Sequence, residues 1–99
     1  MIRHVLTWTL IAEDAEGKNA AFTELSEGFG ALPAVIPEIK MLQLGRDIDE
    51  TKDNWDVALI IDFATTDDLA IYQQHPEHVK VKDIVRRVTG TRTAVDFEL

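Results

Sequence analysis

Hydrophobic and polar residues alternate along four stretches of the chain, and this pattern predicts strands. The alternation is clearest in residues 2–11 and recurs in residues 56–64 and 91–98, whereas residues 38–46 are less regular. The more apolar face of the first stretch carries Ile2, His4, Leu6, Trp8 and Leu10. A histidine on an otherwise apolar face is the first unusual feature of the sequence.

A first helical region is predicted between the first two strands. Glu13 and Asp14 precede it, and acidic residues are favoured at the positively polarised start of a helix. The helix should run from residue 15 to about residue 29, where Gly28 and Gly30 mark its end. Its inward stripe is expected to consist of Ala21, Phe22, Leu25 and Phe29.

A second helical region follows the third strand. Thr65 and Thr66 with the acidic residues 67–68 form a strong helix-start signal. Pro76 should break this helix, and a second piece should then run over residues 77–87, because proline is well tolerated in the first turn. In this piece we expect inward-facing side chains at Val79, Ile84 and Val88.

The remaining segments are predicted to be connections. Residues 32–37 contain Pro33 and Pro37, which disfavour helix for the residues before them, and residues 47–54 are a polar loop of the hairpin type. The resulting order is strand, helix, strand, strand, helix, strand. This order predicts the α+β, ferredoxin-like βαββαβ fold, a four-stranded antiparallel sheet with both helices on one face, as a single domain over residues 1–99.

The one-sided arrangement of helices has a consequence for assembly. It leaves side chains such as Val5, Thr7, Thr9 and Ile11 on a sheet face that no helix covers. A chain of 99 residues also buries a modest fraction of its surface. We therefore expect a homodimer that forms through the open sheet face.

Composition and charge narrow the class of partner. The chain has 18 acidic and 10 basic residues and a formal net charge of −8, so nucleic acid and anionic membrane surfaces are not expected partners. It contains no cysteine, and its longest apolar run, residues 57–61, is far below the about 20 residues that a membrane span needs. No signal peptide is recognisable, and the expected location is the cytoplasm.

All three histidines fall into one candidate site. His4 lies on the first strand, and His75 and His78 lie in a run that begins with Tyr72. Histidine titrates nearest neutral pH, which suits it to proton transfer or metal binding. Since a residue before proline is driven to an extended conformation, we expect His75 at the helix N-cap and His78 in the first turn.

The positive end of a helix disfavours imidazolium, and a neutral imidazole can act as a general base. The neighbouring carboxylate of Glu77 acts in the opposite direction, because its negative charge favours imidazolium. The alternative interpretation is structural: His75 only caps the helix, and His78 bonds to a backbone carbonyl. A zinc site is a further hypothesis, but the proline distorts the spacing and no fourth ligand is evident, so no metal and no cofactor are expected.

The residues resemble those of the stress-responsive dimeric α/β-barrel (Dabb) family. The resemblance rests on the opening residues 2–5, on the segment 36–40 leading to residues 45–47, and on the Tyr72-x-x-His75-Pro76-x-His78 motif. It covers nearly the whole chain in the same order. It implies a ferredoxin-like protomer and a homodimer whose two sheets face each other as a barrel.

A plant polyketide cyclase of this family, which needs no cofactor, is similar in the strand histidine and in the tyrosine–histidine motif. By that resemblance His78 would be the catalytic base, Tyr72 would hold or polarise a carbonyl, and His4 would line the same pocket. The cyclase has a further histidine where this chain has Val57. This difference argues against the same substrate.

Two functions remain open at this point. In the first, the dimer binds a small apolar or aromatic molecule in a pocket between helix and sheet, with His75, Trp8, Phe22 and Phe63 as candidate ligand contacts. In the second, it is a cofactor-independent acid/base enzyme, of lyase, isomerase or cyclase type. The resemblance also leaves room for haem or oxygen chemistry, which related dimeric barrels carry out. Convergence of Tyr72, His78 and His4 on a cavity would favour the enzyme, whereas aromatic side chains filling that space would favour binding or structure.

Overall fold

The chain folds into an antiparallel sheet with helices on one face. The computed structural model describes residues 1–48 and 52–99. The elements in chain order are β1 (Ile2–Leu10), α1 (Ala15–Gly30), α2 (Leu32–Val35), β2 (Ile39–Arg46), β3 (Val57–Phe63), α3 (Thr66–Gln74), α4 (Pro76–Val88) and β4 (Thr89–Glu98). Within the described residues the strand order is β2-β3-β1-β4, and each neighbouring pair is antiparallel. The ferredoxin-like arrangement predicted from the sequence is confirmed.

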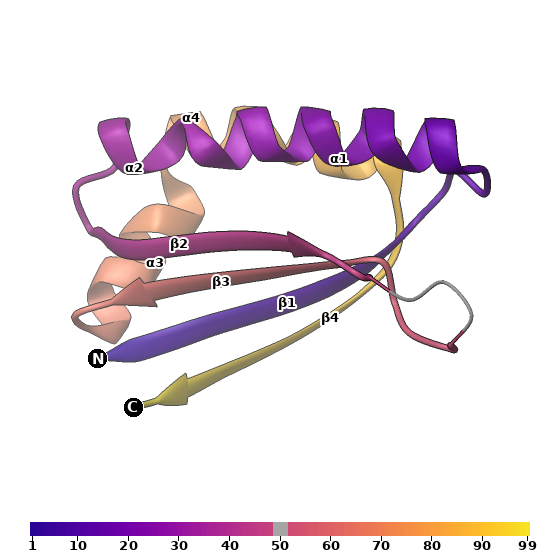
Figure 1. Cartoon of the computed structure of the whole chain (residues 1–99). Helices are drawn as coiled ribbons and strands as arrows, with labels where there is room; N and C mark the ends of the chain where they lie inside the picture. The colour runs from indigo at the N-terminus through magenta and orange to yellow at the C-terminus, as the bar shows by residue number, and fades with distance from the viewer. Residues whose placement is uncertain (49–51) are drawn as a thin grey trace.

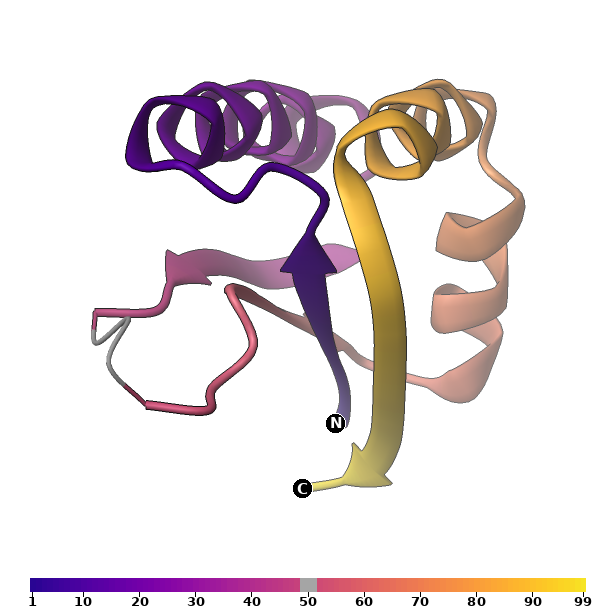
Figure 2. The ribbon, with the colours of Figure 1, turned by 90° about the vertical axis from the view of Figure 1, so that its right-hand side faces the viewer.

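The helices and the sheet form two layers. Helices α1 and α4 lie side by side over one sheet face, and α3 connects β3 to α4 at one end (Figures 1 and 2). No helix of the described chain covers the opposite face (Figure 2). The core between the layers contains the largest fully buried side chains, which are Trp8, Tyr72, Phe29, Phe63, Leu25, Leu32, Ile36, Leu59 and Ile61.

Each of the longer helices begins at a side-chain cap. Asp14 accepts a hydrogen bond from the Gly17 amide at the start of α1, at 2.7 Å. Thr65 caps α3 by accepting from the Asp68 amide at 3.1 Å. These contacts satisfy amides that have no partner within the helix, which is why the polar residues at 14 and 65 mark helix starts in the sequence.

Strand β1 shows the predicted alternation. His4, Leu6, Trp8 and Leu10 are buried beneath the helices, whereas the residues between them are half-buried on the open face. The register pairs His4 with Asp96, Leu6 with Ala94 and Trp8 with Arg92, so these three residues of β4 lie on the helix-facing side. Strand β4 is an edge strand, and after Thr89 all of its side chains are exposed.

Three details differ from the prediction. Residues 32–35 form the short helix α2 rather than an irregular connection, because Pro33 falls in its first turn, where a missing amide hydrogen costs little. Val79 is exposed, and Val81 is the buried valine of α4. Of the three residues expected to face inward, Ile84 and Val88 are partly buried and pack against the core, as predicted, whereas Val79 does not.

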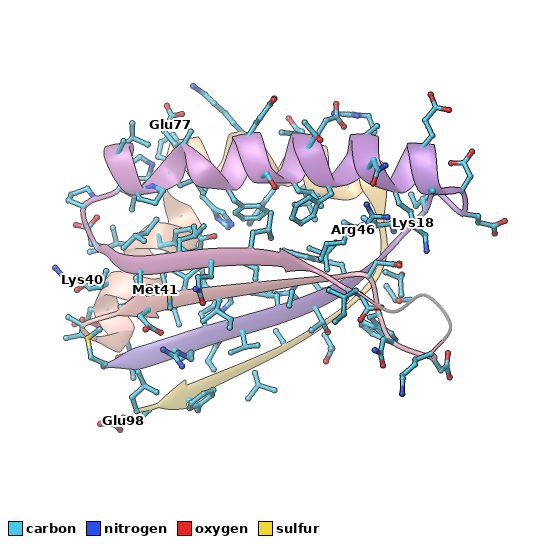
Figure 3. The ribbon with its side chains drawn as sticks, viewed as in Figure 1. Lys18, Lys40, Met41, Arg46, Glu77 and Glu98 are labelled. Carbon is cyan, nitrogen blue, oxygen red and sulfur yellow. The ribbon has the colours of Figure 1, made fainter. Side chains whose placement is uncertain are left out.

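An ionic contact ties the start of α1 to the sheet. Asp56, just before β3, accepts from the Leu10 amide at 2.8 Å and from Lys18 Nζ of α1 at 3.0 Å. Lys18 and Arg46 lie at the same end of the molecule (Figure 3). Burial by itself would raise the pKa of Asp56, but the Leu10 amide and Lys18 outweigh it and lower the pKa below its ordinary value.

The loop predicted over residues 47–54 joins β2 to β3. The Asp47 amide donates to the Asp56 carbonyl at 2.8 Å and closes the hairpin at its base. Residues 49–51, in the middle of this predicted loop, lie outside the described residues.

Candidate functional site

A pocket of about 560 Å³ lies between α4 and the sheet, and its volume is within the range of small-molecule sites. The lining side chains project directly from regular structure, from β1, α1, β3 and α3 as well as from α4 and β4. The lining residues are His4, Leu6, Trp8, Phe29, Leu59, Tyr72, Gln73, His78, Lys82, Val85, Arg86 and Arg92.

Tyr72 lies between two histidines in this pocket. The centre of its ring is 4.2 Å from that of His78 and 6.2 Å from that of His4. On another side it packs against Phe63 at 5.2 Å. The structure thus brings together the three residues that the sequence suggested for catalysis.

His78 is held with one ring nitrogen available. Its Nδ1 is 3.3 Å from the Gln73 carbonyl oxygen, and a carbonyl can only accept, so Nδ1 carries the hydrogen in this contact. The neutral ring then has its lone pair on Nε2. Burial lowers the pKa of His78, the Gln73 carbonyl opposes this shift, and the positive charge of Lys82 adds to the lowering.

Burial shifts the pKa of Tyr72 in the direction opposite to that of His78. The side chain is 1% exposed, and desolvation of the phenolate raises the pKa of Tyr72 well above its ordinary value. Its hydroxyl therefore stays protonated through the physiological range and can donate a hydrogen bond. The pocket combines a neutral imidazole with a protonated phenol, which is the pairing that acid/base chemistry on a carbonyl requires.

His4 is oriented by an acidic residue that the sequence analysis missed. Its Nδ1 is 2.5 Å from Asp96 Oδ1, and the two residues are direct cross-strand neighbours on β1 and β4. His4 is buried, whereas the Asp96 side chain is 41% exposed. The carboxylate fixes the imidazole orientation and leaves Nε2 of His4 for the pocket.

The other candidate contacts are placed as follows. Trp8 lines the pocket, with its ring 5.8 Å from that of Phe29. Phe63 is fully buried behind Tyr72, and Phe22 packs against the core; neither is among the lining residues.

His75 also lies outside the lining. It is the N-cap of α4, as predicted, and accepts from the Glu77 amide at 3.1 Å through Nδ1. The structural interpretation of the histidine run therefore describes the contacts of His75 and His78 correctly. For His78 the carbonyl contact and a chemical role are compatible, because the contact involves only one ring nitrogen.

The cationic lining residues Lys82, Arg86 and Arg92 were also not among the candidates. Lys82 and Arg86 follow His78 at intervals of four and line the pocket from α4. Arg92 and Asp96 are four residues apart on β4, so their side chains lie on the same face of the strand. Helical spacing from His78 could have indicated Lys82 and Arg86. The positions of Arg92 and Asp96 depend on how β4 pairs with β1, which cannot be read from the sequence.

Two further observations concern metal binding and membrane crossing. Within residues 1–48 and 52–99, no group of three or more histidine, aspartate or glutamate side chains is arranged to hold a metal ion. Among the described helices, none is long and apolar enough to cross a membrane.

The family of the chain follows from comparison of its sequence. The model of the stress responsive A/B barrel domain (Dabb) matches residues 2–99. The chain belongs to the Dabb family. Among curated protein sequences, none matches it.

Solved structures share the fold of this chain. A dimeric ferredoxin-like protein of unknown function from Bacteroides fragilis is 29% identical, with a TM-score of 0.89 over 99% of this chain and 95% of that one. One from Thermobifida fusca, also dimeric and of unknown function, is 31% identical, with a TM-score of 0.79 over 99% and 90%. The hydroxynitrile lyase of Passiflora edulis shares the fold at 14% identity, with a TM-score of 0.80 over 97% and 90%.

Proposed function

We propose that this Dabb protein is a cofactor-independent acid/base catalyst that abstracts a proton next to a carbonyl group of a small, largely apolar or aromatic molecule. The observation that carries the proposal is the position of Tyr72 between His4 and His78 in one pocket. Trp8 and Phe29 line this space, Phe22 and Phe63 lie outside the lining, and a volume of about 560 Å³ remains open. The ferredoxin-like fold hosts many activities, so the proposal rests on these side chains rather than on the fold.

In the proposed reaction His78 Nε2 removes the proton, and the Tyr72 hydroxyl donates a hydrogen bond to the carbonyl oxygen. As the carbon–hydrogen bond breaks, its electrons form the enolate, and Tyr72 stabilises the negative charge on oxygen. His4, held by Asp96, lies on the other side of Tyr72 and is positioned to contact the same substrate. Return of the proton from His78 to carbon or oxygen completes the cycle.

We also propose that the protein is a homodimer joined through the open sheet face. The register aligns Val5 with Ile60 on one side and with Val95 on the other, so an apolar row crosses this face. Val95 is 61% exposed and Phe97 is 43% exposed. The dimeric relatives from two bacteria support this assembly, and burial of exposed apolar area would stabilise it.

Proton exchange in D₂O tests the catalytic proposal. Acetophenone carries exchangeable protons next to its carbonyl, and loss of their ¹H NMR signal measures abstraction directly. We expect exchange above the buffer rate with the wild type, no enhancement with His78→Gln, and a reduction of about 100-fold with Tyr72→Phe. A thermal-shift measurement with the same ketone reports binding separately from turnover.

A matched control comes from the third histidine. His75→Asn removes an imidazole outside the pocket and keeps a side chain that caps helices well, so exchange should remain within about twofold of the wild type. If the ketone stabilises wild type and His78→Gln equally and neither accelerates exchange, the protein binds ligands without turnover. In that case the acid/base proposal is wrong.

A further inference from the structure

The pocket has a cationic end that the proposed proton transfer does not use. Three of its lining residues, Lys82, Arg86 and Arg92, are basic, and none is acidic. This is unusual in a chain whose acidic residues outnumber its basic ones by 18 to 10. A cavity that concentrates one sign of charge favours ligands of the opposite sign.

Two of these cations lack an acidic partner. Arg86 donates to Asp83 at 3.3 Å on the surface of α4, but within the described chain no carboxylate pairs with Lys82 or Arg92. The nearest acid along β4 on the same face, Asp96, is engaged by His4. Lys82 and Arg92 therefore remain available to a group inside the pocket.

A buried donor at the same end also lacks a partner. Trp8 is 2% exposed and lines the pocket, and among the described residues its Nε1 is the buried side-chain nitrogen or oxygen atom with no hydrogen-bond partner. Trp8 is the direct cross-strand neighbour of Arg92. An unpaired buried donor is costly, and an acceptor on a ligand would remove that cost.

The cationic end and the imidazole end are separated along regular elements. From His78 the helix advances four residues to Lys82 and eight residues to Arg86, or about 6 Å and about 12 Å at 1.5 Å per residue. From His4 to Trp8 the strand advances four residues, or about 13 Å at 3.3 Å per residue. Helix α4 and strand β1 thus both lead from the histidines at one end of the pocket to Arg86 and Trp8 at the other. Leu6 and Val85 line the part between the two ends.

We infer that the pocket is built for an apolar carbonyl compound that also carries a carboxylate, with the carboxylate held by Arg92 and Lys82 and one of its oxygens accepting from Trp8 Nε1. This inference rests on the proposed function for the carbonyl end and adds the substrate class, a keto acid with an apolar or aromatic body. The long side chains of arginine and lysine shorten the span that the ligand must bridge, so several methylene groups between carbonyl and carboxylate suffice.

Calorimetric titration with matched ligands tests this inference. The probes are 5-oxo-5-phenylpentanoate and 6-oxo-6-phenylhexanoate, each compared with its own methyl ester, which keeps the ketone and removes the charge. We expect each acid to bind the wild type at least 10-fold more tightly than its ester at low ionic strength. The preference should decrease as salt is added, because screening weakens the attraction between the carboxylate and the cationic side chains.

Three variants locate the contact. Arg92→Gln and Lys82→Gln should each reduce the acid-to-ester preference several-fold while leaving the Kd of the ester within about twofold. Arg87→Gln is the matched control, because Arg87 is exposed on the same helix, pairs with Glu24 at 2.8 Å and does not line the pocket. It should leave the preference unchanged.

The outcomes separate this inference from the proposed function. If acid and ester bind equally well while His78-dependent exchange occurs, the carboxylate site is wrong and the acid/base function stands. If the acid is preferred through Arg92 but no variant or wild type accelerates exchange, the anion site stands and catalysis does not. An equal loss of preference in Arg87→Gln would show a general effect of net charge and would overturn the assignment.

Discussion

At the scale of single residues, burial gives His78 and Tyr72 opposite chemical roles. Burial favours the neutral form of any titratable group. For His78 the neutral form is a base, and burial lowers its pKa; for Tyr72 the neutral form is a donor, and burial raises its pKa. The same desolvated pocket therefore yields a proton acceptor and a hydrogen-bond donor 4.2 Å apart between ring centres.

This assignment predicts a pH dependence for proton exchange. His78 acts only when neutral, so kcat/KM should be low when it is protonated and should rise with pH to a plateau. Since the pKa of His78 is lowered, the rise should be centred below the ordinary value of about 6.5. The raised pKa of Tyr72 means that the plateau should continue beyond the ordinary phenol value of about 10. A profile centred above 6.5 would contradict the role of His78.

Part of this residue-scale picture could be predicted from the sequence. Pro76 restricts the residue before it, which is why the cap role of His75 could be expected and is found. The contact between His4 and Asp96 could not be predicted, since 92 positions separate them and only the strand register brings them together. Arg92 was missed as a pocket residue for the same reason.

At the scale of elements, the helices are fixed to the sheet by few polar contacts and a continuous apolar layer. Gly28 of α1 lies where α1 approaches α4 closely, because a Cβ atom there would be 3.1 Å from Ile84 Cδ1. At the other end of α1, Asp56 joins Lys18 to the Leu10 amide. The first contact limits how closely α1 and α4 approach each other, and the second anchors the start of α1 to the sheet.

We predict that Asp56→Ala lowers the free energy of unfolding by about 1–3 kcal/mol, because it leaves the Leu10 amide without its acceptor. The pKa of Asp56 is lowered in the folded state, so its stabilisation is fully present above the unfolded pKa of about 3.9 and is lost as pH falls through the folded value. Urea unfolding of both proteins should thus differ at pH 7 and converge at low pH. The exposed Asp53→Ala should change stability by less than about 0.5 kcal/mol.

At the scale of the whole molecule, the open sheet face combines apolar side chains with a polar pair that is already satisfied. Arg3 donates to Asp62 through Nε at 2.8 Å and through Nη2 at 2.9 Å. The hydrogen bonds from Arg3 lower the pKa of Asp62. Because the two charges compensate each other within the protomer, they can enter a dimer interface without needing a partner from the second copy.

The proposed dimer predicts the effect of a charge on this face. Val95→Asp should convert the dimer to a monomer, because it puts a charge on the apolar face of each copy and removes apolar burial from the interface. Sedimentation velocity measures the change directly. Val35→Asp, at 48% exposure on α2, introduces the same charge away from the sheet and should leave the dimer intact. A wild type that sediments as a monomer would contradict the proposal.

The sequence by itself determined the order and the type of the elements other than α2, because strand alternation, helix caps and the break at Pro76 are local properties of neighbouring residues. It also identified which side chains could carry chemistry. Only the tertiary structure decided that His4 meets Asp96, that Tyr72 separates two imidazoles, and that Trp8 and Arg92 face one pocket. These relations depend on strand register and on the packing of α4, and both are set by contacts between residues far apart in the chain.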